Sequence, residues 1–260
     1  MAGNFVQPVM AMWQREIVRF YRQRNRIIGA LATPLVFWFL IGSGLGGAFR
    51  LPNTEMNYLE YFFPGTLVLI MLFTAIFSTI SVIEDRREGY LQGVLVAPVS
   101  PIAIALGKCL GGATLAMLQG LLFCLLAPFA GISIGIAQWP LLLAVFFIVG
   151  LGLTGLGFLV AWPMDSTAGF HAIMNVLLMP MWLLSGALFP ATGPQSWVSW
   201  AMALNPVTYA VALVRRVLYP GDSGVMHVPG LWLSLAVFGI FGLVTLAIAV
   251  RMIRRWPGRH

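Results

Sequence analysis

The chain has 260 residues, of which 60% are hydrophobic and only 9% are charged, and its mean hydropathy is +0.90. A soluble domain carries roughly a quarter charged residues, so a soluble fold of this size could not hide so much apolar surface from water. At about twenty residues per span, the length allows about six transmembrane helices and no large soluble domain. The composition therefore predicts an all-α integral membrane protein.

The net charge of +7 comes from arginines that lie beside apolar runs and at the two chain ends. This placement favours membrane topology and anionic lipid over nucleic acid as the reason for the charge. Cys109 and Cys124 fall in one predicted helix, about 22 Å apart at a rise of about 1.5 Å per residue, which excludes a disulfide between them. No cleavable signal peptide is evident, because the first apolar run begins near Ile27 and is long enough to span.

The first 26 residues are predicted to form an N-terminal amphipathic interfacial helix (domain 1–26). On a helical wheel, Trp13, Ile17 and Phe20 share one face. The opposite face carries a basic stripe, which suits a helix lying on a membrane surface: Arg15, Arg19, Arg22 and Arg26. An ordinary juxtamembrane anchor and a specific coupling role both remain open for this helix.

Six apolar runs predict the spans of a transmembrane domain over residues 27–250: 27–49, 63–83, 102–130, 139–162, 169–189 and 231–250. Lys108 lies near the entry of the third run, where its ammonium group is expected to snorkel to the interface. Residues 190–219 are interrupted by prolines and rich in aromatic residues, which predicts a re-entrant helical hairpin before the last span. A basic cytoplasmic tail, residues 251–260, follows the last span.

Positive charge is concentrated on one side of the membrane, at the two chain ends and in every second loop between these spans. One side collects the N-terminal arginines, Arg86, Arg87, Lys108 and the C-terminal arginines, whereas the other holds only Arg50, Arg215 and Arg216. By the positive-inside rule, both termini are expected in the cytoplasm of a multi-pass protein of the cell inner membrane.

Catalytic constellations are not found in the sequence. The three histidines are far apart, and neither a zinc motif nor a P-loop is present, so no metal site and no catalytic residue are predicted. The stretch Gly150–Gly155 matches a dinucleotide-binding pattern by letter, but it lies inside an apolar run and is interpreted as helix packing. Acidic residues occur only in predicted loops or terminal segments, so a proton relay at mid-membrane has no groups to use. If the chain transports a substrate, its energy must come from another protein.

Three sequence features together resemble one family of transporters. The first is the amphipathic helix that ends in Arg24-Asn25-Arg26. The second is the charged stretch from Glu84 to Leu91, which leads to Pro98-Val99-Ser100-Pro101. The third is Ser185-Gly186 with Pro190, followed by Asn205-Pro206-Val207-Thr208-Tyr209. The set resembles the membrane permease subunit of type 2 ABC exporters (the ABC-2 family), and is most similar to the drug-resistance (daunorubicin-type) and nodulation-factor export permeases. Tyr90 and Gln92 depart from the threonine and glutamate that this family often has.

The resemblance implies a permease that is not itself an enzyme. Two permease copies, expected to be a homodimer, would pair with two cytoplasmic ABC ATPase subunits that bind ATP and Mg²⁺. The segment 84–101 would couple to the ATPase through Glu84, Asp85, Arg86, Arg87, Glu88, Gly89, Tyr90, Leu91, Pro98, Ser100 and Pro101. A solvated loop whose charges merely fix the topology is the alternative. The re-entrant motif would comprise Ser185, Gly186, Pro190, Asn205, Pro206 and Tyr209.

The family likeness also suggests a substrate path, lined by the first, second and fifth spans of two subunits. Its candidate residues are Phe37, Phe73, Phe77, Met174 and Met181, although residues at such spacing also serve plain packing. The expected cargo is an amphipathic small molecule or a lipid-linked compound, moved out of the cytoplasm or the inner leaflet. Two rival functions remain: an ion-coupled carrier, and a membrane-embedded enzyme or assembly factor that acts on lipids.

Overall fold

The computed structural model describes residues 5–22, 24–45, 56–188, 197–221 and 228–255, and within these ranges the regular structure is entirely helical. This confirms the predicted all-α class. In chain order the elements are α1 (Val6–Arg22), α2 (Arg24–Leu45), α3 (Tyr58–Ser78), α4 (Ile80–Arg87), α5 (Tyr90–Val96), α6 (Pro101–Cys124), η1 (Ala127–Ala130), η2 (Ile136–Gln138), α7 (Trp139–Ala161), α8 (Thr167–Leu183), α9 (Trp197–Leu204), α10 (Pro206–Leu218) and α11 (Leu231–Arg254).

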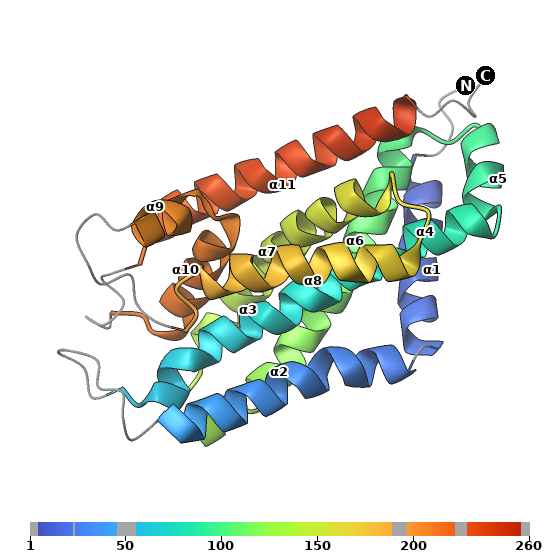
Figure 1. The fold of residues 1–260 in the computed structure, drawn as a ribbon. Coiled ribbons are helices and arrows are strands. Elements are labelled where there is room, and N and C mark those ends of the chain that lie inside the picture. The colour runs from blue at the N-terminus through green and yellow to red at the C-terminus, as the bar shows by residue number, and fades with distance from the viewer. Residues whose placement is uncertain (1–4, 23, 46–55, 189–196, 222–227, 256–260) are drawn as a thin grey trace.

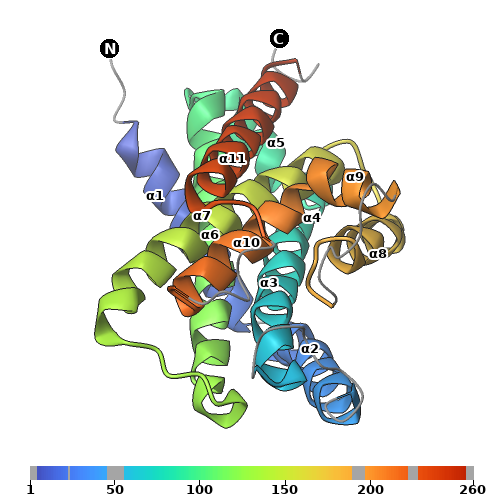
Figure 2. The ribbon, with the colours of Figure 1, turned by 90° about the vertical axis from the view of Figure 1, so that its left-hand side faces the viewer.

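The long helices form a bundle whose two ends differ. Helices α1, α4 and α5 gather at one end, and α9 and α10 lie toward the other (Figure 1). Helix α1 runs across the bundle axis, and its start lies at the same end as the last turn of α11. Figure 2 shows α6 and α7 on one side of α3 and α2 and α8 on the other.

Four helical stretches are long and apolar enough to cross a membrane: 58–87, 101–124, 136–161 and 231–254. They match four of the six predicted spans. Helices α9 and α10 meet at an angle of 79° and would count as a fifth span only if the bent pair crosses. The predicted count of six is not confirmed, because α8 has 17 residues and the apolar part of α2, Leu31–Gly44, is also short.

The predicted third span, 102–130, extends too far. Helix α6 ends at Cys124, and the chain then turns through the short helix η1. Pro128 and Gly131 explain the early end: proline lacks the amide donor that a continuing helix needs, and Gly131 takes a left-handed φ of 81°.

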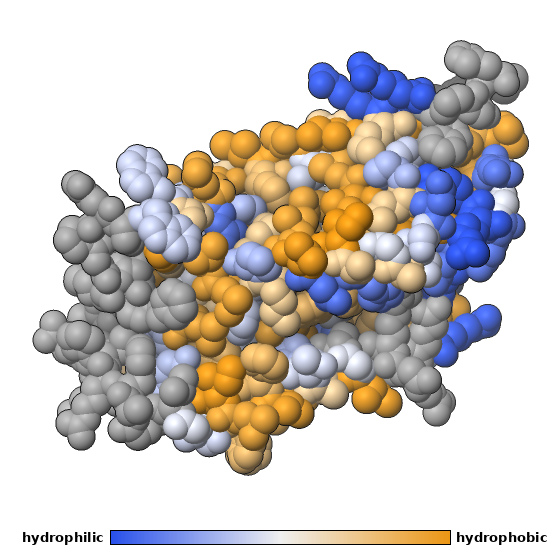
Figure 3. All heavy atoms as spheres, in the orientation of Figure 1, coloured by the Kyte–Doolittle hydropathy of each residue, from blue (hydrophilic) through white to orange (hydrophobic). Residues whose placement is uncertain are grey.

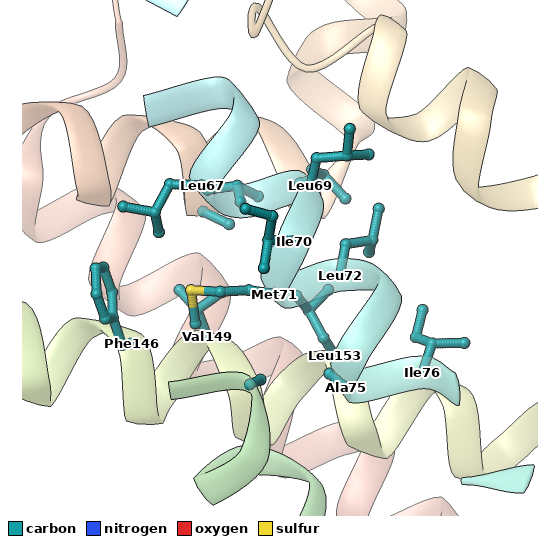
Figure 4. Close-up of a cluster of buried hydrophobic side chains, with 14 of the residues drawn as sticks. Leu67, Leu69, Ile70, Met71, Leu72, Ala75, Ile76, Phe146, Val149 and Leu153 are labelled. Atoms are coloured by element: carbon teal, nitrogen blue, oxygen red, sulfur yellow. The ribbon is translucent and has the colours of Figure 1, made fainter. Parts of the chain in front are cut away.

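Helix α3 is the centre of the bundle. In the stretch 58–87, which contains α3, 89% of the most apolar 18 residues are buried. Helix α3 contacts α2, α6, α7 and α10. Met71 of α3 points toward Phe146 and Val149 of α7, in one apolar cluster that also includes Leu72 and Leu153 (Figure 4). A single helix surrounded by others in this way fixes the relative positions of most of the bundle.

Small residues allow these helices to approach closely. A Cβ atom on Gly112 of α6 would lie 2.4 Å from side-chain atoms of both Ser78 and Thr154, and one on Gly150 would lie 3.0 Å from the Cα of Ala113. Contacts this short leave no room for a methyl group. Gly150 therefore packs one helix against another, as its sequence context predicted.

The surface is divided into an apolar belt and a charged end. Apolar side chains cover the middle of the bundle, and hydrophilic residues gather at the end that carries α1, α4, α5 and the end of α11 (Figure 3). On α11, Trp232, Leu233, Ile240 and Leu243 are all more than half exposed. Such a continuous apolar surface is suited to lipid, not to water.

The close packing at Gly112 makes a stability prediction. Gly112→Ala should lower the free energy of unfolding by about 1–3 kcal/mol, because the added methyl group overpacks the α3–α6–α7 contact. Gly239→Ala on α11 is the matched control: no atom lies within 4 Å of its Cβ position, so the change should be neutral or slightly stabilising. Thermal unfolding of both variants in lipid nanodiscs checks this, and equal melting temperatures would contradict the packing described.

Candidate functional site

The segment that joins α3 to α6 consists of two short helices and two tight turns. Helix α4 continues the direction of α3 and ends at Arg87, and Gly89 then takes a left-handed φ of 77° that favours glycine. After α5, Ser100 caps α6: its hydroxyl oxygen accepts from the amide of Ala103 at 3.1 Å, and Pro101 occupies the first turn. The predicted coupling segment 84–101 is therefore an ordered helical hairpin.

Asp85 of α4 is fully buried and is the centre of a cluster of charged side chains. Its carboxylate pairs with the ammonium group of Lys108 on α6. It also pairs with the guanidinium groups of Arg15 at 2.5 Å and Arg19 at 2.6 Å, both on α1. One carboxylate thus connects three helices that lie far apart in the sequence.

Glu16 of α1 completes this buried network. Its carboxylate pairs with Lys108, which is itself only 4% exposed, so that this lysine lies between two acids. Arg19 pairs further with Glu84 at 3.0 Å and with Glu88 at 3.4 Å. Burial by itself would lower the pKa of Arg19, but the carboxylates of Asp85 and Glu84 outweigh it and raise the pKa above its usual value.

Helix α1 reaches this position because α6 presents glycines to it. A Cβ on Gly107 would lie 2.6 Å from the Cβ of Met12, and one on Gly111 would lie 2.5 Å from the Cβ of Glu16. One turn further along, the indole of Trp13 donates a hydrogen bond to the hydroxyl of Thr114 at 3.0 Å. Glycines spaced by four residues form one face of a helix, so the two backbones can approach closely.

Helix α1 (Val6–Arg22) lies within the predicted segment 1–26 but ends before Arg24 and Arg26, which belong to α2, and its contacts differ from the prediction. Its buried residues are Met12, Glu16 and Phe20, and Arg15 and Arg19 face α4. The expectation that Lys108 snorkels is wrong, because its two acidic partners hold it in the protein interior. Of the other predicted residues, Trp13 and Ile17 are half-buried, Arg22 is exposed, and the side chain of Arg26 lies outside the described residues. Attachment of this helix to a membrane surface stays a prediction.

Arg86 fastens α4 to the turn between α7 and α8. Its guanidinium group donates hydrogen bonds to the backbone carbonyls of Trp162 and Met164 and pairs with Asp165 at 2.9 Å. Arg86 therefore points into the fold, whereas its neighbour Arg87 is exposed. Of the two arginines predicted for ATPase coupling, Arg87 is the one available to a partner.

Helix α5 is anchored on one side and open on the other. Leu91 and Leu95 are buried, and the centre of the Tyr90 ring lies 3.5 Å from the guanidinium carbon of Arg15. Val96 is 76% exposed, an unusual position for an apolar side chain at the charged end of the bundle. We call the exposed residues of this hairpin the α5 surface: Arg87, Glu88, Tyr90, Gln92, Val96, Pro98 and Ser100.

The α9–α10 pair and the end of α8 are held together by side-chain hydrogen bonds. The amide of Asn205 donates to the carbonyls of Met181 and Leu184, and its oxygen accepts from the amide of Val207 at 3.0 Å. Pro206 begins α10, and the hydroxyl of Tyr209 donates to the carbonyl of Ala203 at 2.8 Å. This geometry explains the sharp bend at Asn205; whether the pair forms a re-entrant hairpin stays a prediction.

The first half of the predicted re-entrant motif meets the start of α3. Ser185 donates to the carbonyl of Trp182, and Gly186 takes a left-handed φ of 78°. The carbonyl of Gly186 accepts from the hydroxyl of Tyr61 at 3.1 Å. Pro190, the remaining residue of the motif, lies outside the described residues.

Arg215 is a feature that the sequence analysis missed. It is only 4% exposed, its guanidinium carbon lies 4.2 Å from the centre of the Tyr61 ring, and it donates to the carbonyls of Tyr61 and Gly186 at 3.3 Å. Arg216 instead donates to the carbonyls of Val228 and Pro229. No pattern in the sequence distinguishes the buried arginine from its neighbour.

A pocket of about 380 Å³ lies between α2, α3 and α8, near the end of the bundle that carries α1. Phe73 and Phe77 of the predicted substrate path line it. The other three predicted residues do not: Phe37 is on the exposed face of α2, Met174 is fully buried, and Met181 packs against the core. The structure thus brings two of the five predicted path residues into one site.

These features define a class of protein: a helical membrane protein with an apolar belt, a charged hairpin at one end and no group of three metal-ligating side chains within its described residues. The family follows from comparison with known proteins. The model of the ABC-2 type transporter family matches residues 7–219, and the chain belongs to this family.

The relatives are transport permeases. The chain is 30% identical over 223 residues to the putative transport permease ycf38 of Cyanophora paradoxa, covering 84% of this chain and 76% of that protein. It is 26% identical over 253 residues to nodulation protein J of Rhizobium leguminosarum bv. trifolii, covering 94% of both. It is 23% identical over 263 residues to the probable multidrug ABC transporter permease YbhR of Escherichia coli (strain K12), covering 98% of this chain and 64% of that protein. These relatives agree with membership of the ABC-2 type transporter family.

The buried cluster yields a second stability prediction. Lys108→Ala should lower the free energy of unfolding by about 3–5 kcal/mol, because it leaves the carboxylate of Glu16 buried without a cation and removes one of the three partners of Asp85. Arg87→Ala, which removes an exposed cation from the same end of the bundle, should change it by less than about 0.5 kcal/mol. Thermal unfolding in nanodiscs compares the two.

A third variant separates charge from packing. Adding Glu16→Gln to a Lys108→Met background should restore part of the lost stability, since Asp85 keeps Arg15 and Arg19 as partners and no unpaired charge then remains at residue 16. If Lys108→Ala were as stable as Arg87→Ala, the ammonium would not be held as described.

Proposed function

We propose that this chain is the membrane-spanning permease subunit of an ATP-driven exporter of the ABC-2 type. A separate cytoplasmic ABC ATPase would bind ATP and Mg²⁺, and two permease copies would pair as a homodimer. The observation that carries the proposal is the α5 surface: an ordered, exposed hairpin that is tied by buried charges to the helices of the bundle.

The proposed orientation places the α5 surface in the cytoplasm of a cell inner-membrane protein. The start of α1 and the end of α11 lie at the same end of the bundle as α5, as an even number of spans requires (Figure 1). Counting α2 and α8 with the four long stretches would give six spans, with α9–α10 as a re-entrant hairpin at the opposite end. The arginines of α1 and α11 agree with the positive-inside rule in this orientation.

The α5 surface suits contact with a protein partner. It combines a cation and an acid, Arg87 and Glu88, with the exposed apolar side chain of Val96. Apolar side chains at the centre of a patch with charges around it are typical of interfaces that exclude water from their middle. The anchoring of Leu91 and Leu95 means that a force on this surface acts on the whole hairpin.

The buried charges give a route for movement from the hairpin into the membrane. Helix α4 extends α3 directly, Asp85 ties α4 to α1 and α6, and Arg86 ties it to the turn before α8. We infer that closure of an ATP-bound ATPase dimer would displace α1, α4 and α6 together and tilt α3 with them. Packed elements with discrete arrangements transmit such displacements better than loops do.

An amphipathic small molecule or a lipid-linked compound is the proposed cargo. The names of two relatives, a multidrug permease and a nodulation protein, are compatible with such a cargo. The pocket between α2, α3 and α8 supports the proposal, because it combines three phenylalanine rings with several hydrogen-bonding side chains. A pocket of this size is in the range that binds small molecules.

Association with an ATPase tests the proposal. A tagged chain isolated from native membranes should retain a P-loop ATPase and ATPase activity. Val96→Asp should reduce the retained activity by tenfold or more, because it places an unpaired charge in the centre of the contact. Ile136→Asp, an equally drastic change at a 90% exposed residue of the opposite end, should leave it unchanged.

The rival functions give different results in the same preparation. A chain that elutes folded without any ATPase and exchanges substrate only under a proton gradient would be a carrier. Turnover of a lipid by the isolated chain would point to an enzyme. Either result would overturn the proposed function.

A further inference from the structure

The side chains that line the pocket between α2, α3 and α8 determine which amphiphiles it can bind. Its lining combines the rings of Phe20, Phe73 and Phe77 with hydroxyl, amide and imidazole groups: Thr33, Thr74, Ser78, His171 and Asn175. No carboxylate, ammonium or guanidinium group is among its lining residues in the described part of the chain. A ligand here meets aromatic surface and neutral polar groups.

Two of the polar side chains have hydrogen-bonding capacity that the protein leaves unused. Within the described residues, the amide of Asn175 and the hydroxyl of Thr33 form no hydrogen bond to the protein, and both side chains are exposed. An amide supplies two donors and an acceptor, and a hydroxyl supplies a donor and an acceptor. Asn175 on α8 and Thr33 on α2 therefore each offer a hydrogen-bond donor and an acceptor, on two sides of the pocket.

His171 presents a further acceptor. The Nδ1 atom of His171 lies 2.8 Å from the carbonyl oxygen of Thr167, to which it donates, so in the neutral ring Nε2 is left as an acceptor. The hydroxyl groups of Thr74 and Ser78 instead face α6, where Thr74 contacts the side chain of Gln119 and the Ser78 oxygen lies 2.4 Å from the Cβ position of Gly112. The ring of His171 is held in place by Phe77, with ring centres 4.9 Å apart.

Access to the pocket is from the side of the bundle. Helices α2 and α8 both pack on α3 but make at most sparse contact with each other, so α3 forms the floor of an open groove. The outer residues of α8 are apolar, with Ile173 49% and Val176 77% exposed. Phe20, from α1, and Ser78, the last residue of α3, place the pocket toward the charged end of the bundle.

We infer that this pocket binds the uncharged, hydroxyl-bearing head group of an amphiphile that enters sideways from the adjacent leaflet, and that it rejects anionic amphiphiles. This inference rests on the proposed export function and names the substrate class for it. Hydroxyl groups donate and accept, which matches a mixed set of neutral donors and acceptors. An anion would lose its hydration here without gaining an ammonium or guanidinium partner, and burying an unpaired charge is costly.

Photolabelling of the purified full-length chain in phosphatidylcholine nanodiscs tests this directly. Two probes share one alkyl chain with a diazirine and differ in the head group: a β-D-glucoside and a phosphate. The glucoside should label peptides of α3 and α8 in a saturable manner, with half-saturation at a concentration at least tenfold lower than for the phosphate probe.

Two variants and one control connect the selectivity to the pocket. Thr33→Val and Asn175→Ala should each weaken glucoside labelling about three- to tenfold, the effect of one lost hydrogen bond. Both residues are exposed, so the variants should fold. Ser43→Ala removes another exposed hydroxyl from α2, outside the pocket, and should leave labelling unchanged.

Opposite results would overturn the inference. These are labelling by the phosphate probe at equal or lower concentration, labelling spread around the apolar belt, or glucoside labelling that neither variant weakens. Because neither ATP nor an ATPase takes part, such a failure would leave the proposed function standing. Loss of the proposed function would instead be seen as the absence of a co-purifying ATPase.

Discussion

The ion pair between Lys108 and Asp85 constrains much of this structure. An ammonium group and a carboxylate can remain buried only if each has a partner, because the cost of removing either charge from water is several kcal/mol. Helix α1 supplies the remaining partners: Glu16 pairs with Lys108, and Arg15 and Arg19 pair with Asp85. The charges thus determine which helices meet at this end of the bundle.

Backbone contacts accommodate the same arrangement. Helix α1 can place Glu16 beside Lys108 only because Gly107 and Gly111 leave space for it on α6. On the other side, Arg86 holds the end of α4 against the turn between α7 and α8. The exposed hairpin is consequently connected to most of the bundle through a few short polar contacts, while the middle of the bundle is held by apolar packing around α3.

The sequence predicted the apolar parts of the fold best. Hydropathy alone identified α3, α6, α7 and α11, since each is a long uninterrupted apolar run. It could not identify the partners of polar residues. The sequence predicts a snorkelling Lys108 and indicates no partner for Glu16, because helical periodicity shows which face a residue shares but not which helix will cover that face.

The candidate site could be predicted only in part, because tertiary contacts determine the rest. The charged hairpin was recognised from its motif, but the inward direction of Arg86 and the exposure of Val96 depend on tertiary packing. Phe73 and Phe77, one turn apart on α3, line one pocket, as residues at that helical spacing can. Met174 does not line it, because α8 turns that residue toward the core. The burial of Arg215 and its place over Tyr61 follow from a contact between α3 and α10 that no local pattern shows.

The central claim is that α1, α4 and α6 move as one unit when a partner ATPase closes. Double electron–electron resonance on the reconstituted complex tests it most directly, with spin labels at the exposed residues Gln14 of α1 and Ile102 of α6. The account predicts that ATP binding leaves the Gln14–Ile102 distance unchanged to within about 1 Å. It also predicts that the distance between the two Ile102 labels of the paired copies changes by about 2 Å or more. A change in the first distance with none in the second would show that α1 moves independently of the bundle, and would contradict the account.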